Sequence, residues 1–314
     1  MITALLFALC IVSSGLEGNV YKRLTADSRS RAGSALMAGS WCLGLALLFG
    51  AAAVLTRSTG ISAVRALLAA GGGLCLFLAS FLLLEAMKTN TLSVSVIIMN
   101  LNFVVTVALS ALVLRERVSW LQLAGMLVSV AAILLLNFKS DVKGSPAGAV
   151  FVPLLASAAN GILNFCIKCG SSAAEATGLT GQLAFFAVLY FTAALAAGGT
   201  AAVLARRRGD ADADALASET QPQAATQLFP AKVWPFLALM GVLSGACFFT
   251  EALLAGRINA AALFTVLTSA SIILSVTVGL LFQKERFTWK VAVSLVFCAV
   301  AILCQTGAII AAGG

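Results

Sequence analysis

Three glutamates lie inside long apolar stretches of the sequence, where a carboxyl group is costly to place and is therefore a candidate for function. They are Glu17, Glu85 and Glu251. Each could bind a cationic ligand or carry a proton whose movement is coupled to that of another molecule. For Glu85, a local ion pair with Lys88, three residues further on, is the structural alternative. The chain has no histidine, so imidazole is excluded as an acid–base group and as a metal ligand.

A row of polar residues follows one face of the apolar segment 91–114. Spacings of seven, four and four residues place its members on one side of a helix: Ser95, Asn102, Thr106 and Ser110. The later apolar segment 259–282 repeats the row with Ser271 and Ser275, and Thr268 lies one turn away. Two matching rows predict two walls of one central cavity. The alternative is that small and hydroxylated residues only allow helices to pack closely.

A third polar row follows the segment 146–167. Ser157, Asn160, Asn164 and Lys168 recur at positions i, i+3, i+7 and i+11, which form one helical face. Because an amide is hard to leave facing hydrocarbon, we expect Asn160 and Asn164 to bind a polar ligand in the cavity. Lys168 lies near the end of the segment, so it could either reach that ligand or extend to the lipid headgroups.

The composition identifies the class of protein that must position these residues. Of 314 residues, 61% are hydrophobic and only 10% are charged, with a mean hydropathy of +1.04, whereas a soluble domain carries about 25% charged residues. The sequence therefore predicts an all-α integral membrane protein. Its net charge of +8 comes from lysines and arginines scattered over short loops, which indicates membrane topology and no nucleic-acid partner. The eight cysteines lie in apolar segments and are expected to be packing residues, so no metal or cofactor is expected.

Ten apolar runs are long enough to cross a bilayer, which takes about 17–25 residues each. They are 1–21, 34–55, 66–87, 91–114, 119–137, 146–167, 179–204, 233–255, 259–282 and 287–311. The first run lacks the basic start of a cleaved signal peptide and is expected to be retained. The one long connection, 206–230, is polar and is expected to be a disordered linker rather than a cation-binding loop.

A short charged phrase occurs twice, as RERVSW and as KERFTW, at an offset of 169 residues. The offset pairs Glu116 with Glu285, and both are flanked by Arg or Lys in a loop. We expect these two glutamates to be structural and to fix the turn and the start of the next helix. Ser119 and Gln122, which follow Glu116, fit a capping box.

The repeat divides the chain into two halves of five spans each, 1–138 and 146–314, joined by 139–145. The polar loop at 206–230 lies within the second half. An odd number of spans makes the two copies enter the membrane from opposite sides, so the sequence predicts ten transmembrane helices in two inverted five-helix repeats. That architecture belongs mainly to secondary transporters, whose substrate site lies near the midplane between the halves.

These features resemble the drug/metabolite transporter superfamily and, within it, the ten-helix EamA-type transporters. The resemblance rests on RERVSWLQLAG and KERFTWKVAVS, on EAMKTNTLSVSV at 85–96, and on first spans that end in lysine, GLEGNVYK and GILNFCIK. It covers the chain except for 206–230, and it adds Lys22, the counterpart of Lys168, to the candidate binding or coupling residues. Members often carry a proline in the fourth span of each half, whereas the corresponding IIMNLNFVVT and LTSASIILSV have none.

The expected function is secondary active transport of a small polar metabolite, such as an amino acid, by alternating access, with export as the expected direction. Acids and bases both approach the predicted cavity, which favours a zwitterion over a purely cationic compound. One alternative is proton-coupled efflux of lipophilic cations, with Glu17 exchanging a proton for cargo. Another is a non-transporting membrane scaffold. An enzyme is not expected, because the chain has no paired acidic motif and no HExxH.

The expected setting is a bacterial cytoplasmic membrane, with the chain as a monomer or a homodimer and a proton as the candidate coupling ion. Loops that follow the odd-numbered spans hold most of the lysines and arginines, which places both termini outside the cell. The resemblance to EamA-type transporters implies the opposite, with both termini in the cytoplasm.

Overall fold

Helices make up the computed structural model, which describes residues 2–27, 30–89, 98–137, 146–173, 180–216, 231–282 and 288–311. Ten α-helices lie in these ranges: α1 (Ile2–Asp27), α2 (Arg31–Leu55), α3 (Ala63–Thr89), α5 (Asn102–Val113), α6 (Trp120–Asn137), α7 (Pro146–Ser171), α8 (Leu183–Leu216), α9 (Trp234–Ala255), α10 (Ala260–Phe282) and α11 (Trp289–Ala311). The described ranges contain no strand. The all-α architecture predicted from the apolar runs is confirmed.

Seven of the described helices are long and apolar enough to cross a membrane: α1, α2, α3, α7, α8, α9 and α11. In α5, α6 and α10, the apolar stretch is shorter within the described residues. Leucines such as Leu47, Leu67, Leu127 and Leu303 are exposed on the outside of the bundle. A water-soluble protein would expose such a surface only at an interaction site, but in a bilayer these side chains face hydrocarbon.

The helix starts agree with the sequence signals at the end of the first half. Ser119 N–H donates to Gln122 Oε1 (2.9 Å) and Gln122 N–H donates to Ser119 Oγ (3.2 Å), which is the predicted capping box at the start of α6. Trp120, Trp234 and Trp289 are the exposed first residues of α6, α9 and α11. Tryptophan favours the membrane interface, so these rings suit the positions at which their helices begin.

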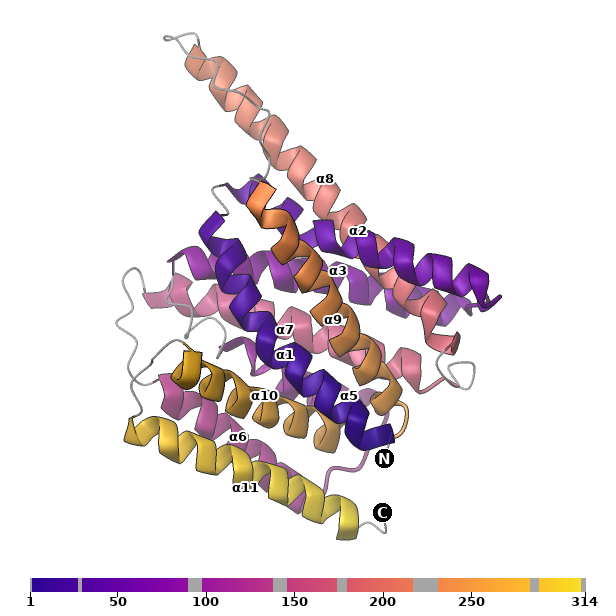
Figure 1. Ribbon diagram of the computed structural model, residues 1–314, viewed down its shortest axis with the longest axis vertical. Coiled ribbons are helices and arrows are strands. Elements are labelled where there is room, and N and C mark those ends of the chain that lie inside the picture. Colours follow the sequence, from indigo (N-terminus) through magenta and orange to yellow (C-terminus); the bar gives the residue numbers. More distant parts are fainter. Residues whose placement is uncertain are drawn as a thin grey trace.

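Four helix pairs organise the bundle: α2 with α8, α3 with α7, α6 with α11, and α1 with α9. Figure 1 shows α1 and α9 side by side across the centre of the view and α6 with α11 along one edge. Glycine permits the closest approaches between helices. A Cβ atom added at Gly73 of α3 would lie 2.1 Å from the carbonyl oxygen of Leu189 in α8, so only glycine allows this contact.

Helix α8 is longer than the sequence predicts. It continues to Leu216, through the first eleven residues of the segment 206–230 that was expected to be a disordered linker. The end of α8 projects away from the other helices (Figure 1). Alanine, the strongest helix former, alternates with aspartate in this stretch, and its propensity outweighs the polar composition on which the linker prediction rested. That prediction is therefore wrong for 206–216, and residues 217–230 lie outside the described ranges.

The segment 91–114 is not one continuous helix over its described part. A turn at Asn100 and Leu101 precedes α5, which begins at Asn102. Leu101 N–H donates to Ile98 O and Val104 N–H donates to Leu101 O, both at 3.0 Å, so the chain is wound more tightly here than an α-helix. Asparagine is a poor helix former in such a stretch, because its side chain competes for backbone hydrogen bonds.

Candidate functional site

A cavity of about 140 Å³ lies where α1, α3, α5, α7, α9 and α10 meet. Each of these helices and the turn before α5 contribute to its polar lining, which comprises Ser14, Glu17, Tyr21, Ser80, Asn100, Asn102, Asn160, Asn164, Glu251, Thr268 and Ser271. Six of these are predicted site residues: Glu17, Asn102, Asn160, Asn164, Glu251 and Ser271. The structure thus brings residues from five helices, far apart in the sequence, around one cavity.

Three residues that line this cavity each have a buried polar atom with no hydrogen-bond partner among the described residues: Asn164 Oδ1, Glu251 Oε1 and Ser271 Oγ. Leaving such an atom unpaired costs about 1–3 kcal/mol, and buried polar groups in folded proteins are therefore nearly always paired. Asn164 and Glu251 are each only 5% exposed, so bulk solvent does not reach them freely. The cavity consequently offers three hydrogen-bonding positions to a guest molecule.

Helix α1 is tied to its neighbours by polar contacts at the cavity wall. Ser244 Oγ in α9 donates to Glu17 Oε1. The hydroxyl groups of Tyr21 and Ser80, in α1 and α3, lie 2.9 Å apart and share a hydrogen bond. Glu17 is thus held against the second half of the chain while it lines the cavity.

The turn at Asn100 and Leu101 places the start of α5 at the cavity, since Asn100 and Asn102 both line it. The first backbone N–H groups of a helix carry partial positive charge, so the start of α5 favours a negatively charged or acceptor group on a ligand. The amide side chains of Asn100 and Asn102 add donors and acceptors at the same wall.

Thr106 lies at a contact between helices and is not among the residues that line the cavity. Its Oγ1 donates to Gly161 O in α7 (3.0 Å) and to Asn102 O (3.1 Å). A Cβ atom added at Gly161 would lie 2.6 Å from Asn102 O. Thr106 therefore joins α5 to α7 beside the cavity. This contact agrees with the alternative interpretation of its polar row, in which hydroxylated residues allow helices to pack closely.

Lys168 is buried at the ends of three helices and is not among the residues that line the cavity. Its Nζ donates to Ala255 O and Ile258 O, both at 2.6 Å, and lies 3.0 Å from Glu116 Oε1. Glu116 Oε2 accepts from Ala260 N–H at 2.8 Å. Lys168 therefore donates hydrogen bonds to the last carbonyl oxygens of α9, and Glu116 caps the start of α10.

The roles expected for these two side chains change accordingly. Lys168 neither reaches the cavity nor extends to a headgroup, because carbonyls and a carboxylate within the protein surround it. Glu116 stabilises the start of a helix, as expected, but this helix is α10 rather than α6, which follows it in the chain. Glu285 lies outside the described residues.

Glu85 forms the local ion pair that is the alternative to a binding role. Lys88 Nζ lies 2.6 Å from Glu85 Oε1, and Ser34 Oγ donates to the same oxygen at 2.6 Å. Arg31 Nε lies 3.6 Å from Glu85 Oε2. These contacts join the start of α2 to the end of α3, and Glu85 is not among the residues that line the cavity. The side chains of Lys22 and Ser275 lie outside the described part of the structure.

The described lining of the cavity contains two carboxyl groups, those of Glu17 and Glu251, and no lysine or arginine. Lys88 and Lys168, which lie in the last turns of α3 and α7, are instead paired with the carboxylates of Glu85 and Glu116. For Lys88 and Lys168, the expectation that bases approach the cavity is therefore not met, whereas the side chain of Lys22 is outside the described part of the structure. The physical reason is that a lysine near the end of a helix is stabilised there by carbonyl oxygens and a nearby carboxylate.

Several lining residues were not predicted, and the sequence holds a signal for one pair. Lys22 and Lys168 are 146 residues apart, and the same offset relates Ser14 to Asn160 and Gly18 to Asn164. All four of these positions line the cavity. Aligning the two lysine-terminated spans would therefore have indicated Ser14 and Gly18.

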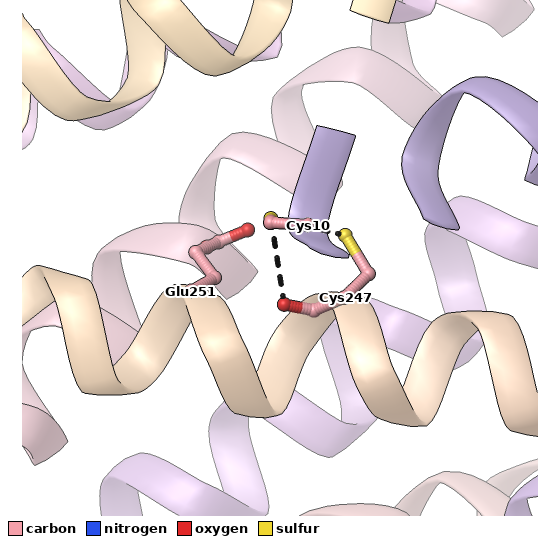
Figure 2. A group of neighbouring side chains, drawn as sticks. All are labelled: Cys10, Cys247 and Glu251. Atoms are coloured by element: carbon pink, nitrogen blue, oxygen red, sulfur yellow. Dashed lines mark hydrogen bonds between the residues drawn. The ribbon is translucent and has the colours of Figure 1, made fainter. Parts of the chain in front are cut away.

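A cluster of possible metal ligands also lies on the cavity, formed by Cys10 of α1 with Cys247 and Glu251 of α9 (Figure 2). The two sulfur atoms are 3.6 Å apart, and Cys10 Sγ also donates to Cys247 O at 3.6 Å. All three ligand atoms lie within 4.8 Å of one another. No sequence spacing indicates this cluster, because 237 residues separate the two cysteines.

Comparisons with known proteins relate the chain to a family and to a fold. Residues 1–138 match the model of the EamA-like transporter family. A solved structure described as "Crystal structure of protein" has a TM-score of 0.65 to this one, at 17% sequence identity, and the match covers 99% of each chain. The two therefore share a fold over their full length. No curated protein matches the sequence.

Proposed function

We propose that the protein is a secondary transporter of a small, amine-bearing polar metabolite, and the match of residues 1–138 to the EamA-like transporter family supports this proposal. An amino acid or a related compound is the substrate class that suits the cavity. The match to this family supports an integral membrane transporter of a small molecule rather than an enzyme. A bacterial cytoplasmic membrane is the proposed location.

The observation that carries the proposal is the set of unpartnered polar atoms in the cavity. Asn164, Glu251 and Ser271 lie on three different helices and line the same cavity, and each has a buried oxygen without a partner among the described residues. Packing alone would not favour three such atoms together, because each one lowers stability. A polar guest that hydrogen-bonds all three would offset this cost while it is bound.

The charges of the lining favour a guest with an ammonium group. Glu17 and Glu251 supply carboxyl groups, and the described lining supplies no basic side chain to compete with a cationic guest. A carboxylate on the same guest would find donors at the start of α5 and in the amides of Asn160 and Asn164. This arrangement suits both ends of an amino acid, and either carboxyl group could carry a coupling proton.

The size of the cavity favours a small metabolite over a bulky lipophilic cation. Its volume is about 140 Å³, and a protein cavity of about 150 Å³ holds a molecule the size of benzene. The lining is also rich in amides, hydroxyls and carboxyl groups rather than aromatic rings, since Tyr21, Phe248 and Phe264 are its only described aromatic residues. Both features support a polar metabolite over the efflux of lipophilic cations.

Transport by alternating access requires two parts of the protein that can move relative to each other about the cavity. The residues that line the cavity support the two predicted inverted repeats as these parts. Ser14 and Gly18 line the cavity together with Asn160 and Asn164, their equivalents 146 residues later.

Later in each half the offset is 169 residues. It relates Asn102 to Ser271 and Ala79 to Phe248, which also line the cavity. The packing of α3 on α7 has its equivalent in that of α9 on α1. In the proposed mechanism the two halves rock about the cavity, which opens to one side of the membrane at a time.

The test is the melting temperature of the purified protein in detergent with single compounds from a panel. Amino acids, small primary amines, nucleosides, sugar phosphates and lipophilic cations form this panel. A ligand at about 100 times its Kd adds about 2.7 kcal/mol to stability. We expect stabilisation by amino acids or small amines, and loss of this stabilisation in Asn164→Leu, which keeps the side-chain volume but removes the amide.

Two serines provide a matched pair of variants. Ser271 and Ser110 are both buried with an unpartnered Oγ, but only Ser271 lines the cavity. Ser271→Ala should weaken ligand binding about five-fold, the equivalent of about 1 kcal/mol for one hydrogen bond, while Ser110→Ala should leave binding unchanged. Stabilisation by lipophilic cations alone, or equal effects of the two variants, would count against the proposal.

A further inference from the structure

The cluster of Cys10, Cys247 and Glu251 brings two thiols and a carboxyl group together inside the membrane domain (Figure 2). Cys10 comes from α1 in the first half of the chain, and the other two residues lie one helical turn apart on α9. All three side chains are buried. Figure 2 shows the carboxyl group of Glu251 directed toward the sulfur of Cys10.

The distances fit a shared metal ion better than a disulfide. Two sulfur atoms that are each about 2.3 Å from a tetrahedrally coordinated zinc lie about 3.8 Å from each other. Cys10 Sγ and Cys247 Sγ are 3.6 Å apart, which is close to that value, whereas a disulfide bond requires about 2.05 Å. The carboxyl oxygen lies within 4.8 Å of both sulfur atoms, so a small side-chain movement would complete the third contact.

Packing explains two neighbouring thiols, but it does not explain the carboxyl oxygen beside them. Glu251 is 5% exposed, and its Oε1 has no hydrogen-bond partner among the described residues. A buried carboxyl group without a partner is costly, and coordination of a cation is one of the ways in which proteins stabilise such a group. The unpaired oxygen is therefore an observation, independent of the two cysteines, that points to a ligand.

All three residues line the cavity, so a metal ion held by them would lie at the cavity wall. From these observations we propose that Cys10, Cys247 and Glu251 form a binding site for one thiophilic divalent cation of the Zn²⁺ and Cd²⁺ class. Thiolate ligands select such metals over Mg²⁺ and Ca²⁺. On binding, each thiol releases its proton to solvent, and the carboxylate supplies the third ligand. The fourth position faces the cavity and takes a water molecule.

The site goes beyond the proposed transport of a metabolite, and the two sites share one residue, Glu251. A cation bound there joins α1 to α9 and hence the first half of the chain to the second. Its binding can be measured on the purified protein without any transported compound. Cys10 and Cys247 have no part in the proposed substrate site, and Asn164 and Ser271 have none in the metal site, so variants at these residues distinguish failure of one proposal from failure of the other.

The test is titration of the purified, reduced protein in detergent with Cd²⁺ alone, followed by calorimetry and by the ultraviolet thiolate-to-metal charge-transfer absorption. We expect one Cd²⁺ per chain, and loss of that binding event in Cys10→Ser and in Cys247→Ser. Glu251→Gln should weaken binding by at least about 10-fold, since loss of even an outer-shell partner costs that much. The double variant Cys166→Ser/Cys169→Ser is the matched control and should bind Cd²⁺ as the unaltered protein does.

X-ray absorption at the metal edge of the unaltered protein provides a second measurement that needs no variant to fold. Two sulfur ligands with oxygen in the remaining positions would support the site. Four sulfur ligands or none, Cd²⁺ binding that survives loss of Cys10 or Cys247, or unchanged affinity in Glu251→Gln would overturn it.

Discussion

Lys168 and Glu116 are charged residues that serve the packing of helices rather than the cavity. The Nζ of Lys168 contacts two carbonyl oxygens at the end of α9 and one oxygen of Glu116. Glu116 uses its other oxygen to accept from Ala260 N–H at the start of α10. A buried ammonium group is stable only with such a full set of partners. The pair therefore fixes the junction between α9 and α10, beside the segment that follows α5.

Replacing Lys168 with methionine preserves most of the side-chain volume and removes the ammonium group. Glu116, whose side chain is 19% exposed, then remains at the start of α10 without its cation. We expect a loss of about 3 kcal/mol of stability, the lower end for breaking a buried ion pair, because Glu116 keeps some contact with solvent. Thermal unfolding of the purified protein in detergent measures the loss.

Lys88→Met makes the same chemical change at the other lysine that pairs with a carboxylate. Arg31 and Ser34 still contact Glu85 in that variant, so we expect a loss of less than about 1 kcal/mol. If the two variants unfold at the same temperature, Lys168 does not stabilise the junction of α9 and α10 as its contacts indicate.

Some residues of the candidate site could be predicted because hydrocarbon penalises their chemistry. Glu17, Asn160 and Asn164 stand out in apolar segments on that ground alone, and all three line the cavity. Cys10 and Cys247 could not be predicted in the same way, since free cysteine behaves as a small hydrophobic residue and is common in apolar helices. Only the packing of α1 on α9 brings these two residues together across 237 positions.

At the scale of the elements, length and hydropathy predicted the ten helices of the described ranges, but local hydrogen bonding and helix propensity determine where these helices break and end. The turn at Asn100 and Leu101 arises from bonds between residues three apart, and no proline marks it in the sequence. The extension of α8 to Leu216 arises from helix propensity in a polar stretch, which hydropathy does not report. Both differences between the predicted and the observed helices concern the backbone rather than the burial of apolar side chains.

The contact between α3 and α8 allows a direct test of helix packing. A Cβ atom at Gly73 would lie 2.1 Å from Leu189 O and 3.1 Å from Ala193 N, which are backbone atoms that cannot easily move. Gly73→Ala should therefore force the two helices apart and cost about 1–3 kcal/mol, as overpacking generally does. Thermal unfolding of the purified variant measures this change.

Gly71, on the same helix, is the matched control, because a Cβ atom added there meets nothing within 4 Å. Gly71→Ala should raise stability by about 0.5–1 kcal/mol, since alanine favours the helix over glycine. Equal effects at the two positions would show that helix propensity, rather than the approach of α8, determines the outcome.

At the scale of the whole molecule, the cavity lies between helices of both halves and is lined at equivalent positions of the two. Glu17 on α1 contacts Ser244 on α9, so the wall of the cavity joins the halves directly. The repeated phrase RERVSW and KERFTW led to the prediction of such a cavity, because inverted repeats place the substrate site between them. The phrase itself indicates nothing of the cargo, whose class is inferred from the charges and volume of the cavity.

The most direct test of transport through this cavity is counterflow in proteoliposomes loaded with an amino acid or small amine that stabilises the protein. Two glycines offer matched variants, because an added Cβ atom meets nothing within 4 Å at either Gly18 or Gly44. Gly18 lines the cavity, whereas Gly44 is exposed on the outside of α2.

Leucine at Gly18 would fill much of the cavity, and leucine at Gly44 would add only to the lipid-facing surface. We expect counterflow by the unaltered protein and by Gly44→Leu, and none by Gly18→Leu, with all three proteins unfolding at similar temperatures. Counterflow by Gly18→Leu at the rate of the unaltered protein would contradict a transport path through this cavity.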